Sequence, residues 1–509
     1  MSVVQPMLGG SRGWPAVNPK DADASYNAGL AALTGGTELA TLPLLDAARA
    51  FHPRDARLWQ VTGLLYRSIE DLAPAVAALE KAAVLAPADA LIAHGHARAA
   101  LEAGIPAVYL FERAHRLAPQ DGAVLLGLAA AHSAQGQDEA ALALIRNQLR
   151  EHPAWIPGHA LVARLHCVRG ESERLADSFE VALKVASTEA DLWRELIMTL
   201  IHADRFDDAL DAIARARRAS GSHLAFDANE AVCIDELGDM AAADRLFAAL
   251  ADVEDFNFDI RRVRHALRAG RPEEVAAIAE PASAGPSGNM IAPYLALAWR
   301  MLVDPRWQWL EGDERLVGVY DLGDELDSLA PFAERLRALH LTTHQPLEQS
   351  VRGGTQTDGE LFSRIEPEIR ALRRVVVGAV ERHIAQLPPQ DVRHPLLAYN
   401  RPGLVRFAGS WSVRLSGQGY HSNHIHPQGW LSSALYIALP EAAPGASPHA
   451  GWLELGGPQK QLGLELPPTR LVEPKPGRLV LFPSTMWHGT IPFAAGERLT
   501  VAFDVARPH

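Results

Sequence analysis

Three histidines within six residues, His421, His424 and His426, precede an apolar run that is typical of a β-strand. His424 and His426 form an H-x-H pair. In extended chain, residues i and i+2 face the same side, so both imidazoles can point into one cavity. His488 ends a later strand-like run, "LVLFPSTMW". Because imidazole binds Fe, Cu and Zn, we predict a metal site at His424 and His488, with His426 as the candidate for a third ligand. His421 has the wrong spacing for a ligand, and we expect it in a loop near the substrate.

The histidines are flanked by short β-type runs that are separated by Pro-Gly and Gly-Gly turns, and we expect these runs to position them. The runs are "GLVRFAGSWSVRL", "WLSSALYIAL", "GWLELGG", "GRLVLFPS" and "ERLTVAFDV". Strands at this spacing predict an antiparallel sandwich or barrel. Before them, "IEPEIRALRRVVVGAVERHIAQL" predicts one amphipathic helix, and "PLEQSVRGGTQT" predicts a polar loop. Weak candidates for substrate contacts are Arg352, Gly353 and Thr355 in that loop, His421, and Trp430.

From about residue 24 to 251 the chain is rich in Ala and Leu, and it repeats. Pro53, Pro87, Pro119 and Pro153 are 34, 32 and 34 residues apart. This period is typical of helix–turn–helix repeats of the tetratricopeptide type, and "LWQVTGLLYRSIEDLAPAVAALEKAAVLAP" resembles their consensus. Such arrays bury their cores between neighbouring repeats and leave a concave groove. We therefore predict an all-α, right-handed superhelix whose groove holds a peptide or a partner protein.

The sequence divides into four predicted segments. Residues 1–22 form an N-terminal extension, and 23–255 form the tetratricopeptide-type repeats. The periodicity loosens over 256–345, which we interpret as degenerate or capping helices and a linker. Residues 346–509 form the β domain. The predicted fold class is multidomain α + β.

The β domain resembles the 2-oxoglutarate/Fe(II) oxygenase domains that are found fused to tetratricopeptide repeats in bacteria. The matching segments are "QPLEQSVRGGTQT", "HIHPQGWLSSALYIALPE" and "PGRLVLFPSTMWHGTIPF…GERLTVAFDV". The resemblance implies a double-stranded β-helix (jelly-roll) fold and oxidation by O2, with decarboxylation of 2-oxoglutarate to succinate. It implies that His424 and His488 bind iron and that Arg498 binds the distant carboxylate of 2-oxoglutarate. Further candidates for contacts to the oxo acid are Thr500, Tyr436 and Ser412.

One position departs from this family pattern. Two residues after His424, where the pattern has Asp or Glu, the chain has His426. We leave three roles open for His426: a third metal ligand, a group behind the ligands, or a substrate contact. A neutral three-His site leaves the metal one charge more positive and suits Cu and Zn as well as Fe. A cupin is the nearest rival, but its motif needs a Glu where Trp430 or Leu431 stands.

The composition restricts the partners and the compartment. The chain of 509 residues carries 61 acidic and 48 basic side chains, and its formal net charge of −13 argues against general nucleic-acid binding. It has no apolar run long enough to predict a membrane span, and its start does not resemble a signal peptide. Cys167 and Cys233 are expected to be free thiols of a cytoplasmic protein. A homo-oligomer stays possible.

These patterns predict a 2-oxoglutarate- and Fe(II)-dependent dioxygenase that hydroxylates a side chain of a peptide or protein recruited by the repeats. Its cofactors would be Fe(II), 2-oxoglutarate and O2, with Cu possible at a three-His site. The alternatives are a three-His metalloprotein with other oxidative chemistry, a catalytically inactive repeat scaffold, and a small-molecule oxygenase that uses the repeats for oligomerisation.

Overall fold

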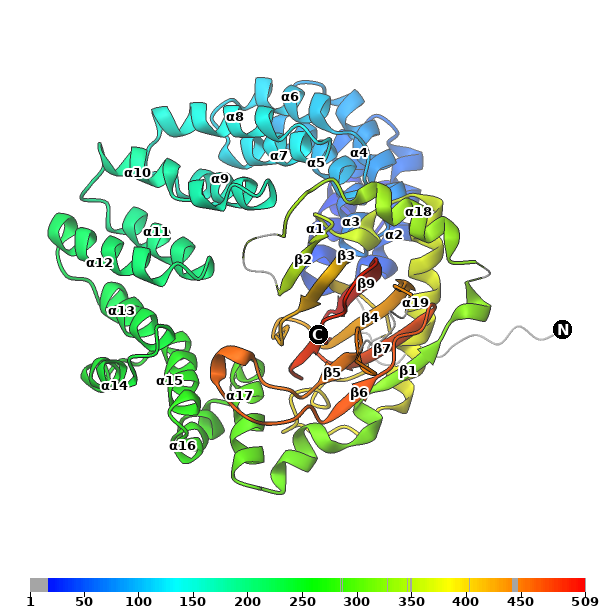
Figure 1. Ribbon diagram of the computed structural model, residues 1–509. Helices are drawn as coiled ribbons and strands as arrows, with labels where there is room; N and C mark the ends of the chain where they lie inside the picture. Colours follow the sequence, from blue (N-terminus) through cyan, green and yellow to red (C-terminus); the bar gives the residue numbers. More distant parts are fainter. Residues whose placement is uncertain are drawn as a thin grey trace. The chain divides into compact units, whose positions relative to one another are not determined.

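The computed structural model describes residues 17–283, 285, 287–326, 328–345, 347, 350–401, 403–441 and 447–508. Most of the predicted N-terminal extension, residues 1–16, therefore lies outside the described chain. The chain divides into two compact units (Figure 1), residues 1–131 with 363–365, and residues 132–362 with 366–509. Each unit is described separately.

Paired helices build the first unit. They are α1 (Ala22–Gly35), α2 (Glu38–Phe51), α3 (Ala56–Ser68), α4 (Leu72–Leu85), α5 (Ala90–Glu102), α6 (Val108–Leu117) and α7 (Gly122–Ser133), which crosses the boundary. The first helix of three successive pairs begins after an aspartate, and these caps recur every 34 residues. Asp21, Asp55 and Asp89 each accept a hydrogen bond of 3.0 Å from a backbone N–H of the first turn.

Small residues allow the two helices of a pair to approach closely. Gly63 of α3 faces Leu79 and Ala75 of α4, and a Cβ at Gly63 would lie 2.6 Å from Leu79 Cγ. Ala75, Leu79 and Ala82 are fully buried. The close approach thus depends on the absent side chain at Gly63.

The second unit continues the helix pairs. They are α8 (Asp138–Glu151), α9 (Ile156–Val168), α10 (Asp177–Leu183), α11 (Ala190–His202), α12 (Phe206–Ser220), α13 (Leu224–Glu236), α14 (Met240–Ala249), α15 (Phe256–Arg268), α16 (Pro272–Ser283) and α17 (Gly288–Met301). One contact recurs at the start of the repeats. The Trp59 indole donates to the Pro53 carbonyl, and the Trp193 indole donates to the Ser187 carbonyl six residues before it. The predicted helical repeats are thus confirmed.

Two antiparallel sheets form the β domain. The larger sheet has the order β1-β7-β4-β9-β3-β2, and the smaller sheet has the order β6-β5-β8. The strands are β1 (Gly318–Asp321), β2 (Val351–Gln356), β3 (Phe407–His421), β4 (Leu431–Ala438), β5 (Leu453–Leu455), β6 (Arg470–Val472), β7 (Arg478–Pro483), β8 (His488–Thr490) and β9 (Arg498–Val505). This confirms the predicted class of a helical region followed by an antiparallel β domain, consistent with a 2-oxoglutarate oxygenase fold.

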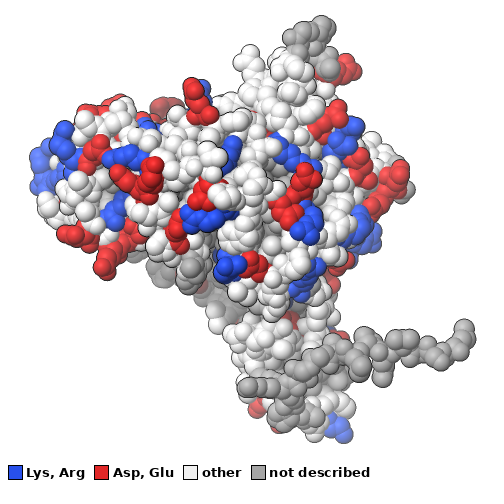
Figure 2. Space-filling model, turned by 90° about the horizontal axis from the view of Figure 1, so that it is seen from below, with Lys and Arg blue, Asp and Glu red and all other residues white. Residues whose placement is uncertain are grey.

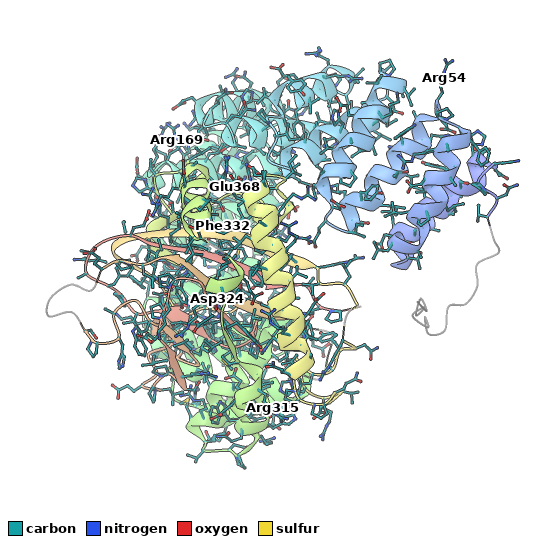
Figure 3. All side chains as sticks on the ribbon, turned by 90° about the vertical axis from the view of Figure 1, so that its right-hand side faces the viewer. Arg54, Arg169, Arg315, Asp324, Phe332 and Glu368 are labelled. Carbon is teal, nitrogen blue, oxygen red and sulfur yellow. The ribbon has the colours of Figure 1, made fainter. Side chains whose placement is uncertain are left out.

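Helices α18 (Ala330–Leu339) and α19 (Pro367–Gln386) pack on the larger sheet. Figure 3 shows α19 running across the sheet, with Phe332 of α18 and Glu368 of α19 labelled near each other. Their apolar side chains share one core with β4, β7 and β9. The predicted helix in this region is confirmed, but the predicted loop "RGGTQT" is wrong. Most of it is strand β2, which is held by pairing with β3.

The surface carries charged side chains of both signs. On the face in Figure 2, acidic and basic side chains are interspersed. None of the helices in the described part of the chain has both the length and the apolar character needed to cross a membrane.

Candidate metal centre

The three predicted histidines converge on one point. His424 lies in the extended segment between β3 and β4, and its backbone exchanges two hydrogen bonds of 3.0 Å with His488 on β8. The ring centroids are 4.2 Å apart for His424 and His488, and 5.1 Å apart for His426 and His488. One possible ligand atom from each ring lies within 4.8 Å of the others. Two separate segments thus bring three imidazoles within reach of one metal ion.

Hydrogen bonds turn the same nitrogen of each ring toward that point. Nδ1 of His424 donates to the Ser422 carbonyl (2.8 Å), and Nδ1 of His488 donates to the Met486 carbonyl (2.9 Å). Nε2 of both rings therefore keeps its lone pair. Burial, with the positive charge of neighbouring histidines, lowers the pKa of His424 and of His488 well below the usual value. Both rings are thus neutral near pH 7, the form that binds metals.

His426 has a different partner, a carboxylate. Its Nδ1 donates to Oδ2 of Asp504 on β9 at 2.6 Å, and the two side chains are 18% and 11% exposed. Oδ1 of Asp504 accepts a hydrogen bond of 2.5 Å from the Ser432 hydroxyl of β4. The backbone N–H of His426 donates to the Ser484 carbonyl. His426 is therefore fixed by both its backbone and its ring, with Nε2 as the free nitrogen.

A buried cation shares the cavity of the histidines. A cavity of about 50 Å³ is lined by the three histidines and by Arg498 and Thr500. Arg498 is 2% exposed, and its guanidinium lies 5.0 Å from the centre of the Tyr436 ring. Burial lowers the pKa of Arg498, but a guanidinium stays charged near pH 7. Arg498 forms no ion pair with any acidic side chain in the described part of the chain, and its Nε has no hydrogen-bond partner there.

The buried, unpaired charge of Arg498 shows whether the cavity suits the expected anionic co-substrate. A buried charge is costly unless it is paired. An anionic ligand in the cavity would supply the missing partner of Arg498, while the histidine nitrogens would hold the metal. The donor set thus fits a metal with a dicarboxylate co-ligand.

Ser350 and His421 close one side of the centre. The Ser350 hydroxyl lies 3.1 Å from His424 Nε2 and 3.1 Å from His421 Nδ1. Burial, followed by the positive charge of Arg498, lowers the pKa of His421 to about 3. His421 is not part of the three-His group and stacks on His424 at 5.9 Å. It is therefore a neutral wall of the cavity at neutral pH.

A larger cavity of about 1040 Å³ lies in front of His424 and His426 within the second unit. One wall comes from the β domain and includes Gln356 and Trp411. The opposite wall comes from the repeats, at the end of α9, the short helix η1 (Ser172–Arg174) and the turn between α11 and α12. The repeats thus contribute directly to the space in front of the candidate metal centre.

The remaining predicted residues lie in different places. Arg352 lines the larger cavity. Gly353 and Thr355 line a separate cavity on the other face of β2, where the Thr355 hydroxyl contacts His340. Trp430 belongs to the apolar core, and its indole donates to the Leu396 carbonyl. The structure therefore does not bring Gly353, Thr355 or Trp430 to the site.

Ser412 also points away from the histidines. Its hydroxyl donates to the Thr500 carbonyl and lies 3.1 Å from His340 Nε2. On β3, Trp411 and Val413 instead line the metal cavity. The expectation for Ser412 is wrong because it assumed that Ser412 is on the inward face, whereas alternate residues of a strand point to opposite faces.

Among the residues at the site that were not predicted are Asp504, Gln356 and Ser350. Asp504 could have been found from the sequence, because it lies four and six residues beyond Thr500 and Arg498 and so shares their face. Gln356 pairs with Val413 in the sheet and lines both cavities. No sequence pattern places Ser350.

Two family models match parts of this chain. The family model described as "Putative 2OG-Fe(II) oxygenase" matches residues 409–504, and that described as "Tetratricopeptide repeat" matches residues 107–165. The comparison with curated proteins finds no match. Among solved structures, MamA from Desulfovibrio magneticus RS-1 is 18% identical with a TM-score of 0.30, covering 34% of this chain and 99% of that one. A Pseudomonas putida prolyl-4-hydroxylase is 18% identical with a TM-score of 0.26, covering 38% of this chain and 94% of that one. The two family models thus mark a tetratricopeptide repeat region and, after it, a domain that matches the model described as "Putative 2OG-Fe(II) oxygenase".

Proposed function

We propose that the protein is a 2-oxoglutarate- and Fe(II)-dependent oxygenase that hydroxylates a side chain of a peptide or protein held by the helical repeats. The observation that carries the proposal is the single cavity that contains three converging imidazoles and the unpaired Arg498. A catalytic iron with 2-oxoglutarate would supply O2 activation for the oxidation of a C–H bond.

The residues of the site divide this work. His424, His426 and His488 would hold the metal through Nε2, since their Nδ1 atoms are engaged. Arg498 would pair with the distal carboxylate of 2-oxoglutarate, and the Tyr436 ring beneath it fixes the guanidinium. The apolar side chains of Leu453 and Phe482 in the same cavity exclude water.

The larger cavity supports the substrate class. Its volume of about 1040 Å³ is at the upper limit for a small-molecule pocket, and repeat helices form one wall. A polypeptide is the ligand that tetratricopeptide-type repeats ordinarily bind. A side chain of that polypeptide could reach His424 and His426 from this cavity.

An anaerobic titration tests the oxygenase proposal. Apoprotein receives Fe(II) and then 2-oxoglutarate, and the visible charge-transfer band is recorded. We expect the band in the wild type and its loss in His488→Ala. Arg498→Gln should raise the half-saturating 2-oxoglutarate concentration about 10- to 100-fold, because a charge-assisted pair contributes about 1.5–3 kcal/mol. Arg414→Gln is the matched control, since Arg414 pairs with Glu497 outside the cavity. Metal binding without a band would contradict the proposal.

The peptide part needs its own assay. The protein, Fe(II), 2-oxoglutarate and O2 are incubated with a mixture of peptides, which mass spectrometry then screens for the gain of one oxygen atom. We expect gain on particular peptides with the wild type and none with His488→Ala. Succinate formation without any modified peptide, but with an oxidised small molecule, would contradict the assigned substrate class.

A second candidate is a three-His metalloprotein with other oxidative chemistry. His426, in the place of a carboxylate ligand, favours it because all-imidazole sites also suit copper. The same titration separates the two, since this candidate predicts metal binding and no response to 2-oxoglutarate.

A further inference from the structure

Asp504 is an acidic residue that contacts the candidate metal centre, and its contact is made through His426. Its Oδ2 accepts from His426 Nδ1 at 2.6 Å, and it is not a member of the group that could itself hold the ion. In the described part of the chain, Asp504 forms no ion pair with lysine or arginine. The negative charge of this carboxylate is therefore directed at one ring.

Two strands hold Asp504 in this orientation. Asp504 of β9 lies opposite Ser432 of β4, and Oδ1 accepts from the Ser432 hydroxyl at 2.5 Å. The Ser432 hydroxyl, whose proton goes to Asp504, accepts from the Ser484 hydroxyl at 2.9 Å, and the Ser484 backbone carbonyl accepts from the backbone N–H of His426. The turn at Gly429 packs against the same group, since a Cβ there would lie 3.1 Å from Asp504 Cβ. The carboxylate and the imidazole are thus set by one packed cluster.

We infer that Asp504 is a positioning residue that makes His426 the third metal ligand and replaces the missing carboxylate from one ring away. A carboxylate on Nδ1 fixes the tautomer, orients Nε2 and makes the ring a stronger donor. Three neutral imidazoles leave the full charge of a divalent ion uncompensated, and Asp504 supplies one negative charge nearby. The inference rests on the metal-binding part of the proposed function and not on 2-oxoglutarate turnover.

Cobalt binding tests this role without any turnover. Full-length apoprotein is titrated with Co(II) alone, and the visible d–d bands report affinity and ligand set. Removing a group of this kind ordinarily weakens metal binding 10- to 100-fold. We expect about 10-fold weaker binding for Asp504→Asn, which keeps a hydrogen-bond acceptor, and about 100-fold for Asp504→Leu. Ser432→Ala leaves the carboxylate in place and should weaken binding much less.

A double-mutant cycle distinguishes positioning from a structural effect. If Asp504 acts through His426, Asp504→Asn should change Co(II) affinity less than about 2-fold in a His426→Gln background. An equal loss in both backgrounds, or no loss in the wild-type background, would overturn the inference. Urea unfolding of each metal-free variant shows whether that variant is folded. If an Asp504 variant is misfolded, Ser432→Ala, which perturbs the same cluster but keeps the carboxylate, is compared with the wild type instead. If no charge-transfer band forms with Fe(II) and 2-oxoglutarate, the oxygenase proposal is rejected, but the result of the Co(II) titrations on Asp504 is unaffected.

Discussion

Alternate residues of β9 carry the charges of the site. Arg498, Thr500 and Ala502 line the metal cavity, and Asp504 contacts His426 from the same face. Asp504 lies six residues after Arg498 on the same strand, which places their backbones about 20 Å apart. The two side chains are therefore too far apart to form an ion pair. The cation therefore stays available to an anionic ligand while the anion serves the third histidine. One strand thus supplies both signs of charge without neutralising either.

Another buried histidine predicts how stability depends on pH. His383 of α19 is 1% exposed, and its Nδ1 lies 3.1 Å from the Tyr320 hydroxyl. Burial lowers the pKa of His383 to about 4, from 6.5 in unfolded chain. Between these values the unfolded state binds the proton that the folded state does not, so stability falls as pH falls from 6.5 to 4. We expect His383 to contribute about 2–3 kcal/mol of this loss between pH 7 and 4.5.

His383→Gln, which cannot titrate but can still bond Tyr320, should reduce the pH dependence by that amount. Urea unfolding of the metal-free protein at pH 7 and pH 4.5 measures it. His152→Gln, at an exposed helix end, is the control for the substitution itself. An unchanged slope in His383→Gln would show that this histidine is already accessible to protons in the folded state.

The sequence predicts some residues of the site because their pattern is local. The H-x-H spacing, the strand-like run before His488 and the alternation of Arg498 with Thr500 all follow from neighbouring residues. Ser412 could not be placed in this way, because its face depends on the pairing of β3 with β9. There Val413 lies opposite Thr500, and Ser412 lies opposite Val501. Register between strands depends on contacts that are distant in the sequence.

At the scale of elements, glycines of the repeats differ in what surrounds them. At Gly63 of α3, a Cβ would lie 2.6 Å from Leu79 Cγ and 3.1 Å from the Ala75 carbonyl, whereas at Gly95 of α5 the nearest atom is 3.7 Å away. We expect Gly63→Ala to destabilise the protein by about 1–3 kcal/mol through overpacking. Gly95→Ala should stabilise it by up to about 1 kcal/mol, since alanine favours helix.

Thermal unfolding followed by circular dichroism compares the two variants, which carry the same substitution on the first helices of adjacent pairs. A lower midpoint for Gly63→Ala with a higher one for Gly95→Ala supports the close helix crossing. Equal shifts in both would show that helix propensity, and not packing, decides.

The sequence predicted the elements whose periodicity is strong. Helix α19 and the strands β4, β5, β7 and β9 lie within the predicted runs, and β3 begins within its run but continues beyond it to His421. Strand β2 was missed because its two glycines are typical of a loop, and β1 was missed because it has only four residues. Both strands are specified by the neighbours with which they pair, β3 and β7, and not by their own composition.

At the scale of the molecule, the second unit joins the end of the repeats to the β domain. The Trp487 indole, next to His488, donates to the Pro293 carbonyl of α17 at 3.0 Å, and the ring packs on Tyr294. Arg264 of α15 donates to the Gln459 side chain. Trp487 and residues of α15, α16 and α17 share one apolar core. The last repeats therefore support the strand that carries a candidate ligand.

This sharing predicts that the β domain does not fold when it begins at residue 346. Such a fragment lacks β1 and α18, whose Phe332 and Leu336 lie in the core of the larger sheet, and it lacks the partner of Trp487. Each Å² of apolar surface that becomes exposed in the fragment lowers the free energy of unfolding by about 25 cal/mol. We expect fragment 346–509 to lack a sharp unfolding transition and near-ultraviolet circular dichroism, whereas fragment 132–509, which contains the second unit, should show both. A cooperative transition in fragment 346–509 would show instead that the sheet needs no support from the helices before it, and would place an independent domain boundary at residue 346.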